Sequence, residues 1–240
     1  MLTIENLYIK YKKNREFSVE NLSLNINKGE IFGFLGQNGA GKSTTLKAVA
    51  GILPYQKGVI TICGFDLFKE PNLAKQEVGY LSSDERTAYE SLTGTEYINF
   101  IVNIYGIEKT LAAKRLQDYS ARFKMTAVLD FPISTYSFGF KQLINLLALF
   151  IRQPKLWILD EPFVGLAPEV AQEIKNCMLE AKKSGSTIFF SSHYLDMLDK
   201  ICDKVGLIKK GKLVKVLDMQ HLKNKKESLE SHYFEMIENQ

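Results

Sequence analysis

Residues 36–44 have the types and spacing that binding a chain of phosphates requires. They fit the pattern G-x-x-x-x-G-K-[ST], which is typical of the P-loop. Glycines let backbone N–H groups approach phosphate oxygens with no Cβ atom in the way, and a helix that follows directs its positive end at the anion. We therefore expect nine residues to form a phosphate-binding loop: Gly36, Gln37, Asn38, Gly39, Ala40, Gly41, Lys42, Ser43 and Thr44.

Two side chains of this loop are suited to particular tasks. Lys42 supplies a flexible cation for the outer phosphates, and the hydroxyl of Ser43 can ligate Mg²⁺. The apolar run 31–35 before the loop predicts a buried parallel strand, and apolar residues between 46 and 53 recur at helical spacing after it. A strand, a glycine-rich turn and a helix in that order distinguish a P-loop from a turn that binds nothing.

Two acidic residues follow a second apolar run. The run covers residues 156–159, and Asp160 and Glu161 come directly after it. Acids at the C-terminal end of a buried parallel strand lie where ligands bind in α/β sheets. The same sequence pattern also occurs where a strand simply ends in a solvated loop. Because the chain also carries a P-loop, we expect Asp160 to hold Mg²⁺ and Glu161 to act as a general base or to position an attacking water.

The composition is that of a soluble globular protein. The 240 residues can form one α/β domain or two small ones, and the net charge of +4 gives no strong field for nucleic acid. Cys63, Cys177 and Cys202 are odd in number and widely spaced, which argues against a disulfide framework and suits a reducing compartment. No stretch reaches the ~18 apolar residues of a membrane span, and residues 1–13 alternate like a strand, unlike a signal peptide. Work at a membrane would therefore require docking to another chain.

The order of the predicted elements indicates an α/β fold, a P-loop NTPase with a mixed sheet. Period-two alternation in residues 1–30 predicts an N-terminal antiparallel β subdomain. From residue 84 to about 140, apolar residues recur at helical spacing and strands are scarce, which predicts an inserted α-helical subdomain. Strands over 156–159 and 187–190, joined by a helix over 168–184, then indicate parallel βαβ units.

The end of the chain is predicted as a hairpin followed by a tail. The hairpin closes the sheet around Lys210-Gly211, so that the main domain covers residues 1–217. The tail, residues 218–240, is polar and predicted to be helical. A regulatory helix, a dimer contact and a solvated end remain open as its role.

On these motifs, the chain resembles the nucleotide-binding subunit of an ABC (ATP-binding cassette) transporter over about residues 1–217. Residues 136–142, Tyr-Ser-Phe-Gly-Phe-Lys-Gln, end 18 residues before Asp160 and are similar to the family signature L-S-G-G-Q. In the family this loop begins a helix and contacts the γ-phosphate of ATP on the partner subunit. The resemblance thus implies that Ser137 and Gly139 bind ATP, whereas Ser-x-Gly alone would indicate only a helix N-cap.

Two more residues obtain their expected roles from the resemblance. His193 follows the predicted strand 187–190, as the family's switch histidine does, and would contact the γ-phosphate and the attacking water. Tyr11 stands where the family has an aromatic residue that stacks on adenine. Outside this family context, a lone histidine or tyrosine is more often a packing residue.

The chain departs from the family pattern at three places. Residues 82–85 replace the usual glutamine, with Ser83 the nearest positional equivalent and Asp84 a second residue that could reach the metal. Phe138 replaces the first signature glycine, and Ala167 replaces the aspartate of G-L-D-P. Because the P-loop lysine, both acids and the histidine remain, we expect hydrolysis to persist, and to be slow.

The resemblance implies ATP and Mg²⁺ as cofactors and a homodimer or heterodimer of such subunits around ATP. Hydrolysis would drive transport by a separate integral membrane subunit, with this chain at the cytoplasmic face of the cell membrane. Residues 92–96 and the compact length are most similar to bacterial exporters. Two alternatives stay open: a soluble ATPase of this family that acts on nucleic acid or ribosomes, and a nucleotide-gated binding module with low turnover. We expect no nucleic-acid partner, because the chain lacks a basic block.

Overall fold

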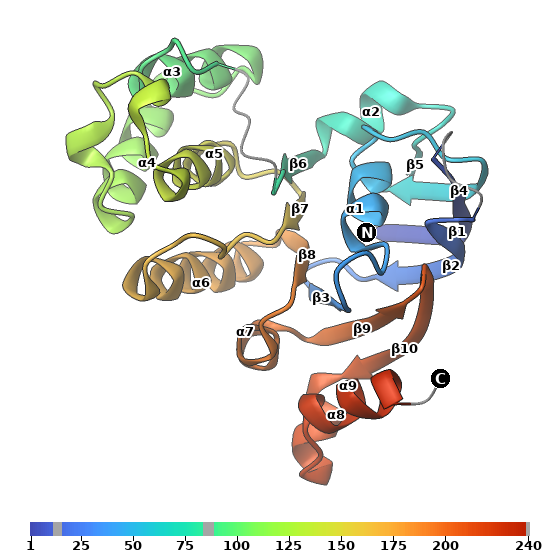
Figure 1. Cartoon of the computed structure of the whole chain (residues 1–240). Helices are drawn as coiled ribbons and strands as arrows, with labels where there is room; N and C mark the ends of the chain where they lie inside the picture. The colour runs from blue at the N-terminus through green and yellow to red at the C-terminus, as the bar shows by residue number, and fades with distance from the viewer. Residues whose placement is uncertain (12–15, 84–88, 239–240) are drawn as a thin grey trace.

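The computed structural model describes residues 1–11, 16–83 and 89–238, and it contains two β-sheets (Figure 1). An antiparallel sheet has the strand order β2-β1-β4-β5, and a larger sheet has the order β10-β9-β3-β8-β7-β6. The strands are β1 (Leu2–Ile9), β2 (Val19–Ile26), β3 (Ile31–Leu35), β4 (Lys57–Ile62), β5 (Phe65–Asp66), β6 (Val78–Leu81), β7 (Leu156–Asp160), β8 (Thr187–Ser192), β9 (Lys204–Lys209) and β10 (Lys212–Asp218).

The larger sheet is parallel except at β10, which pairs antiparallel with β9. All side chains of β3, β7 and β8 are buried, as expected for central strands that are covered on both faces. In the register of this sheet, Ser191 of β8 lies opposite both Phe34 of β3 and Asp160 of β7. The carboxyl ends of the P-loop strand and the acid strand therefore meet at one edge, separated only by β8.

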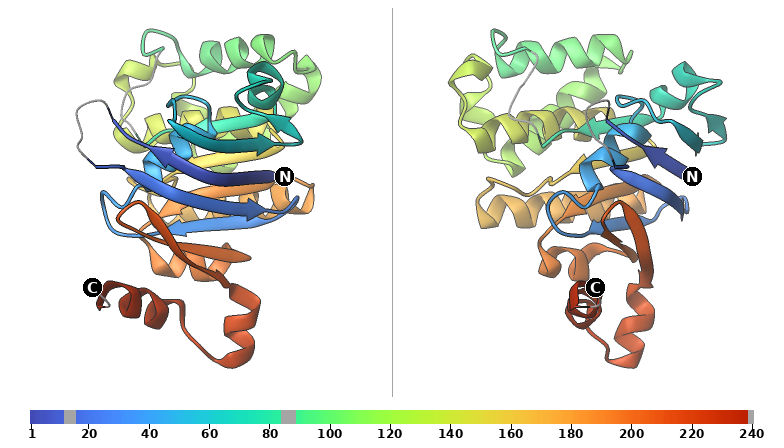
Figure 2. Two further views of the ribbon diagram at one scale, coloured as in Figure 1. Left: turned by 90° about the vertical axis from the view of Figure 1, so that its right-hand side faces the viewer. Right: turned by 45° about the vertical axis from the view of Figure 1, so that its right-hand side comes forward.

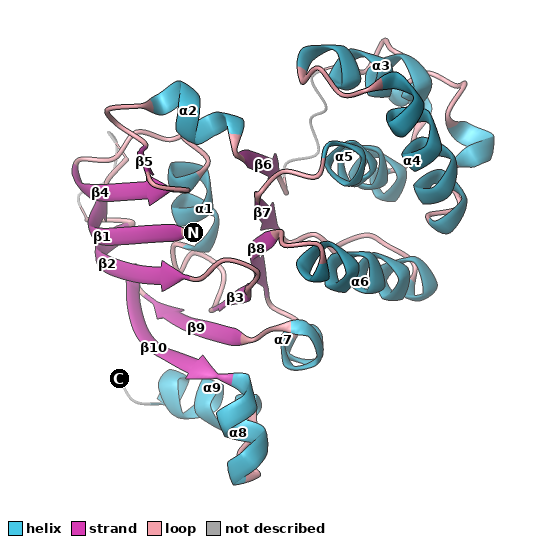
Figure 3. Cartoon of the chain, turned by 180° about the vertical axis from the view of Figure 1, so that it is seen from behind, coloured by secondary structure: helices cyan, strands magenta, loops and turns pink. Residues whose placement is uncertain are grey.

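Helices cover both faces of the larger sheet (Figure 3). One lies between the two sheets, and the others lie on the far face or beyond the sheet edges. They are α1 (Lys42–Val49), α2 (Pro71–Gln76), α3 (Gly94–Ile104), α4 (Lys109–Arg122), α5 (Phe138–Arg152), α6 (Pro168–Lys183), α7 (Leu195–Ile201), α8 (Met219–Lys225) and α9 (Leu229–Glu238).

Alternation along the strands divides the apolar core into two clusters. Phe32 and Phe34 of β3 pack toward α1 and the antiparallel sheet, whereas Ile31 and Leu35 face the cluster under α5, α6 and α7. The helix α1 carries Leu46 into the first cluster. This burial fixes the beginning of α1, and with it the loop 36–41, against the edge where β3 and β7 end.

Helices α3, α4 and α5 form a group beside the sheets. A capping box begins α3, because Thr93 accepts a hydrogen bond from the backbone of Glu96 and the Glu96 carboxylate bonds back to the Thr93 backbone. The helical part extends past the boundary expected near residue 140, because α5 continues as one apolar helix to Arg152. No helix in the described ranges is both long and apolar enough to cross a membrane.

The C-terminal segment packs on the domain. Helices α8 and α9 follow the β9–β10 hairpin, at the end of the molecule away from α3 (Figure 2). Met219, Leu222, Leu229 and Met236 are buried in the same core cluster as α7 and β9. This segment is helical over Met219–Lys225 and Leu229–Glu238, and one face of each helix is buried while the other is exposed.

Candidate nucleotide-binding site

A cavity of about 1060 Å³ lies over the P-loop. Six of the nine predicted loop residues line it: Asn38, Gly39, Gly41, Lys42, Ser43 and Thr44. Tyr11, Ser83 and Glu161 line it from three other elements. Gly36, Gln37 and Ala40 do not line it; their backbone carbonyl oxygens accept hydrogen bonds that shape the loop.

Close packing explains two of the three glycines of the loop, Gly36 and Gly41. A Cβ atom on Gly36 would lie 2.4 Å from the carbonyl oxygen of Ile208, and one on Gly41 would lie 2.6 Å from that of Ser18. Gly41 also has φ 104°, a left-handed conformation in which a side chain is strained. Any larger residue would push the loop away from β9 and β2, so these glycines hold the backbone N–H groups of residues 41–44 at the start of α1 toward the cavity.

Lys42 lies within the loop that it is expected to serve. Its Nζ donates hydrogen bonds to the carbonyl oxygens of Gly36 (2.7 Å) and Gln37 (3.2 Å). Burial lowers the pKa of Lys42, and the nearby charges of Glu161 and Asp160 partly oppose that effect. An anion in the cavity would add a further charge that favours the ammonium form.

Asp160 is fully buried and accepts hydrogen bonds from three hydroxyl groups. Ser43 and Ser191 donate to Oδ1 at 2.9 and 2.6 Å, and Ser83 donates to Oδ2 at 2.8 Å. These serines come from α1, β8 and the segment after β6, so residues more than a hundred positions apart converge on one carboxylate. Asp84, the other residue proposed for the metal, lies outside the described residues.

This oxygen-rich cluster fits Mg²⁺. The ion prefers hard oxygen ligands and is held by one or two carboxylates, with nucleotide phosphates and waters completing its shell. Ser43 and Ser83 provide hydroxyls at the cavity wall, and both donate to the buried carboxylate of Asp160. No group of three or more His, Cys, Asp or Glu side chains within residues 1–11, 16–83 and 89–238 could hold a metal ion.

Glu161 and His193 are brought together beside this cluster. Glu161 Oε2 lies 3.0 Å from His193 Nδ1, and the Glu161 backbone N–H donates to Ser191 Oγ at 3.0 Å. The backbone of Glu161 has φ 50°, which is uncommon for a residue with a side chain. This turn directly after β7 lets Glu161 line the cavity while Asp160 stays buried. His193 is exposed and stacks on Tyr194, with ring centroids 4.1 Å apart.

Tyr11 borders the cavity at the other end of the P-loop. Its hydroxyl lies 3.3 Å from Thr44 Oγ1, and 39% of the residue is exposed. The tyrosine is thus tied to the start of α1 by its hydroxyl. This position suits the adenine-stacking role implied by the family resemblance, which stays a prediction.

The structure does not bring Ser137 and Gly139 to this cavity. Ser137 is exposed and caps α5 by accepting a hydrogen bond from the Phe140 backbone N–H at 3.3 Å. A Cβ atom on Gly139 would lie 2.6 Å from the carbonyl oxygen of Gly165, and one on Gly165 would lie 2.4 Å from the ring of Phe138. The signature segment therefore packs tightly on the loop that follows Asp160 and Glu161, and its serine faces outward.

Some residues of the site were not predicted from the sequence. Ser191 lies near the end of β8, and the parallel register that places it opposite Asp160 is the signal that could have identified it. The cavity is also lined by residues 16–18 and by Lys210 and Gly211. The turn at Lys210-Gly211 was predicted, but its position beside the P-loop depends on long-range packing that no local pattern reveals.

The geometry agrees with comparisons to known proteins. Residues 19–164 match the family model described as ABC transporter. The chain is 35% identical over 216 residues to the linearmycin resistance ATP-binding protein LnrL of Bacillus subtilis (strain 168), covering 90% of this chain and 68% of LnrL. It is 32% identical over 216 residues to the ABC transporter ATP-binding protein NatA of the same organism, covering 89% and 88%. It is 34% identical over 209 residues to the bacitracin transport ATP-binding protein BcrA of Bacillus licheniformis, covering 87% and 67%.

Solved structures share the fold. The structure of an ATP-binding subunit of an ABC transporter superposes with a TM-score of 0.91 at 27% identity, covering 99% of this chain and 100% of that one. The dimeric, post-hydrolysis structure of the ATP-binding cassette MJ0796, bound to ADP and Pi, superposes with a TM-score of 0.83 at 17% identity, covering 91% and 99%. The second likeness concerns the fold alone.

Proposed function

Because this chain belongs to the ABC transporter ATP-binding family, whose members hydrolyse ATP, we propose that two such subunits close around Mg²⁺–ATP and drive export by a separate membrane protein. The observation that carries the proposal is the convergence on one cavity of the P-loop, the Ser43–Asp160 pair and the Glu161–His193 pair. Together these groups provide what ATP hydrolysis requires: phosphate binding, a metal site and a base for water.

Each group has a distinct task in this proposal. The P-loop N–H groups and Lys42 bind the phosphate chain, and Ser43 with Asp160 holds Mg²⁺. When bound, Mg²⁺ neutralises phosphate charge that develops during the reaction. Glu161 takes the proton of the attacking water at its carboxylate, and the contact with His193 Nδ1 holds both side chains in position. That contact leaves Nε2 of the imidazole available to the γ-phosphate.

The placement of the signature segment supports a dimer. Ser137 and the N-terminus of α5 are suited to an anion but lie away from the cavity of their own chain. A second copy arranged head to tail would bring its Ser137 and Gly139 to the ATP held by this P-loop. MJ0796, whose dimer was solved with ADP and Pi, provides a precedent on the same fold. Within the subunit, Gln142 Nε2 contacts the Glu161 carbonyl oxygen at 3.4 Å, which links the signature helix to the acid pair.

A groove beside β6 supports docking of the membrane subunit. It has a volume of about 310 Å³ and lies between the sheet domain and helices α3 and α5, with Lys75, Tyr80, Tyr105 and Arg152 among its lining residues. The guanidinium carbon of Arg152 lies 3.8 Å from the centroid of the Tyr105 ring. The same guanidinium donates hydrogen bonds to backbone carbonyl oxygens at the start of β6 and just before it. Tyr80 of the groove is only three residues before Ser83, which contacts Asp160. A partner seated there would act directly on the metal site.

The direction of transport and the location are inferred from relatives. LnrL is named for linearmycin resistance and BcrA for bacitracin transport. Resistance is consistent with moving a compound out of the cell, which favours export. The ATP-binding subunit would then lie on the cytoplasmic face of the membrane, attached through the groove.

The proposal is tested by phosphate release and efflux in a strain that carries the membrane subunit. We expect the wild-type chain to release phosphate from Mg²⁺–ATP, and Lys42→Ala to abolish both phosphate release and efflux. A Lys226→Ala variant, which alters an exposed lysine beyond α8, serves as the control. Efflux that survives Lys42→Ala would contradict the proposal.

A further inference from the structure

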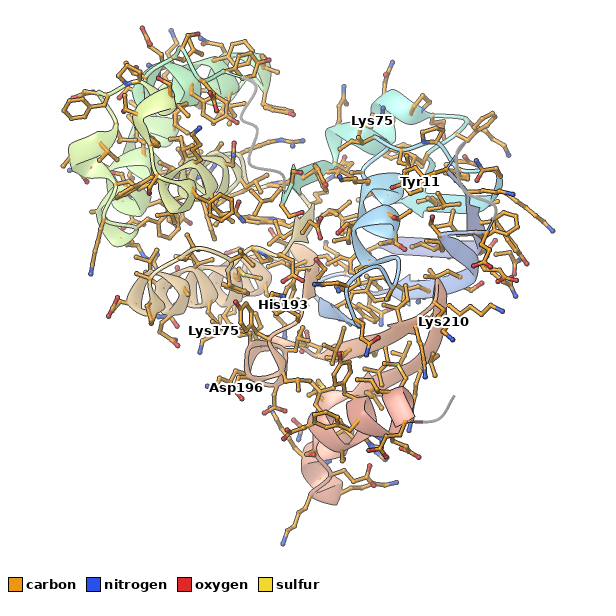
Figure 4. All side chains as sticks on the ribbon, in the orientation of Figure 1. Tyr11, Lys75, Lys175, His193, Asp196 and Lys210 are labelled. Atoms are coloured by element: carbon orange, nitrogen blue, oxygen red, sulfur yellow. The ribbon has the colours of Figure 1, made fainter. Side chains whose placement is uncertain are left out.

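We propose that Lys210, at the turn between β9 and β10, binds the nucleotide through its ammonium group, which contacts the phosphate chain. This inference rests on the proposed function, because it assigns a further residue to the same site. Lys210 belongs to none of the motifs that identified the site, and its position follows only from the fold. Figure 4 labels Lys210 at the tip of the hairpin.

The turn is fixed to the P-loop by its backbone. Lys210 and Gly211 have φ 48° and 77°, so both residues are left-handed, as in the tightest β-hairpin turns. The Gly211 N–H donates to the Ala40 carbonyl oxygen at 2.9 Å, and the Gly211 carbonyl oxygen accepts from the Glu20 N–H at 2.9 Å. A Cβ atom on Gly211 would lie 2.8 Å from the Ser18 carbonyl oxygen. The turn is thus wedged between the P-loop and the beginning of β2, and Lys210 is held at a constant distance from the phosphate-binding backbone.

The Lys210 side chain shares the nucleotide cavity with Lys42. These two are the cations among the described residues that line it. Lys42 donates to carbonyl oxygens of the loop, whereas Lys210 is exposed and has no ion pair with any residue in the described ranges. A nucleoside triphosphate carries several negative charges, and a cation at the wall of a cleft is attracted to it more strongly than one on an open surface.

The residue type supports a role beyond the turn itself. Two-residue turns of this kind favour Asn-Gly, because Asn tolerates the left-handed conformation better than residues with long side chains. The chain also has lysines at the left-handed positions Lys124 and Lys226, so the turn accepts a lysine without requiring one. What lysine adds at Lys210 is a flexible cation at the wall of the nucleotide cavity.

The turn preference also provides a variant that separates charge from structure. Lys210→Asn removes the ammonium group while keeping a residue that suits the turn, and Lys210→Arg keeps a cation. Lys212→Asn serves as a matched control, because Lys212 lies on the same hairpin, pairs with Glu20 at 3.2 Å and does not line the cavity. Isothermal titration calorimetry with ATP, ADP and adenosine, at low and high salt, gives the Kd of each ligand for each variant. Comparing these Kd values separates the contribution of the phosphates from that of adenosine.

We expect Lys210→Asn to raise the Kd for ATP by about 1.5-fold to fivefold at low salt, the range for an exposed ion pair, and less at high salt. Adenosine binding should not change, and Lys210→Arg and Lys212→Asn should bind ATP like the wild type. An unchanged Kd for ATP in Lys210→Asn would overturn the inference, as would an equal loss of adenosine binding. A wild-type chain that binds no ATP would instead overturn the proposed function on which the inference rests.

Discussion

Replacing Ser83 with alanine tests whether the hydroxyl cluster around Asp160 supports metal binding. Ser83 Oγ donates to Asp160 Oδ2 at 2.8 Å and is the one described side chain with a hydrogen bond to that oxygen. A hydrogen bond to a charged group contributes about 1.5–3 kcal/mol. Because Asp160 keeps two other hydroxyl donors and the cavity admits water, we take the lower end. The expected change is about 1.5 kcal/mol, which is slightly more than tenfold in affinity.

The assay compares the Kd of ATP with Mg²⁺ and with EDTA for each variant. We expect Ser83→Ala to reduce the gain in affinity from Mg²⁺ about tenfold and to leave ATP binding in EDTA unchanged. Ser83→Thr should retain most of the gain, because it keeps a hydroxyl. Ser184→Ala, at an exposed position after α6, is the matched control. If Ser83→Ala keeps the full Mg²⁺ effect, or loses affinity equally in EDTA, the hydroxyl does not serve the metal site.

Three further predictions concern the stability of the fold and the uptake of protons when ATP binds. Arg122 of α4 forms ion pairs with Glu173 (2.6 Å) and Glu180 (2.9 Å) of α6. In urea titrations, Arg122→Ala should therefore lower the free energy of unfolding by about 2 kcal/mol, and Arg122→Lys should lower it by less. An unchanged midpoint of unfolding would refute this. Gly165→Ala should destabilise the protein by about 1–3 kcal/mol through its clash with the Phe138 ring and its left-handed φ of 76°, and Phe138→Ala should relieve the part due to the clash in a double-mutant cycle. Additive effects would contradict the contact. Burial lowers the pKa of Lys42 below its ordinary 10.5, and bound phosphates raise it, so ATP binding should take up protons in alkaline buffer. Titrations in buffers of different ionisation enthalpy measure this uptake, and its absence at alkaline pH would show that the phosphates do not reach Lys42.

The parts of the fold that sequence patterns predicted are those in which local periodicity and burial agree. The strand β3, the P-loop glycines and α1 follow one another within 19 residues, and each has its own signal. The same holds for β7, whose four apolar residues end at Asp160. The short elements β5, α2 and α7 had no such signal, because two to seven residues carry too little periodicity to stand out from a loop.

The site was predicted less completely, because it depends on strand register and long-range packing. Asp160 was expected to hold a metal, but its contacts with Ser83 and Ser191 arise only when β6, β7 and β8 are placed in parallel register. In the same way, Phe138 could be seen to replace a family glycine, but not to pack against Gly165. The docking of α9 next to the P-loop, where Lys209 donates to the Met236 carbonyl oxygen at 2.6 Å, likewise has no local signature.

In the proposed mechanism, ATP held at this P-loop joins two subunits, and Glu161 ends the joined state by hydrolysis. Light scattering on the Glu161→Gln variant tests both parts, because this substitution preserves the shape of the site and removes its base. With saturating Mg²⁺–ATP, we expect a stable dimer that the wild type forms only transiently and that Lys42→Ala in the same background abolishes. A Glu161→Gln variant that binds ATP and remains a monomer would contradict this mechanism.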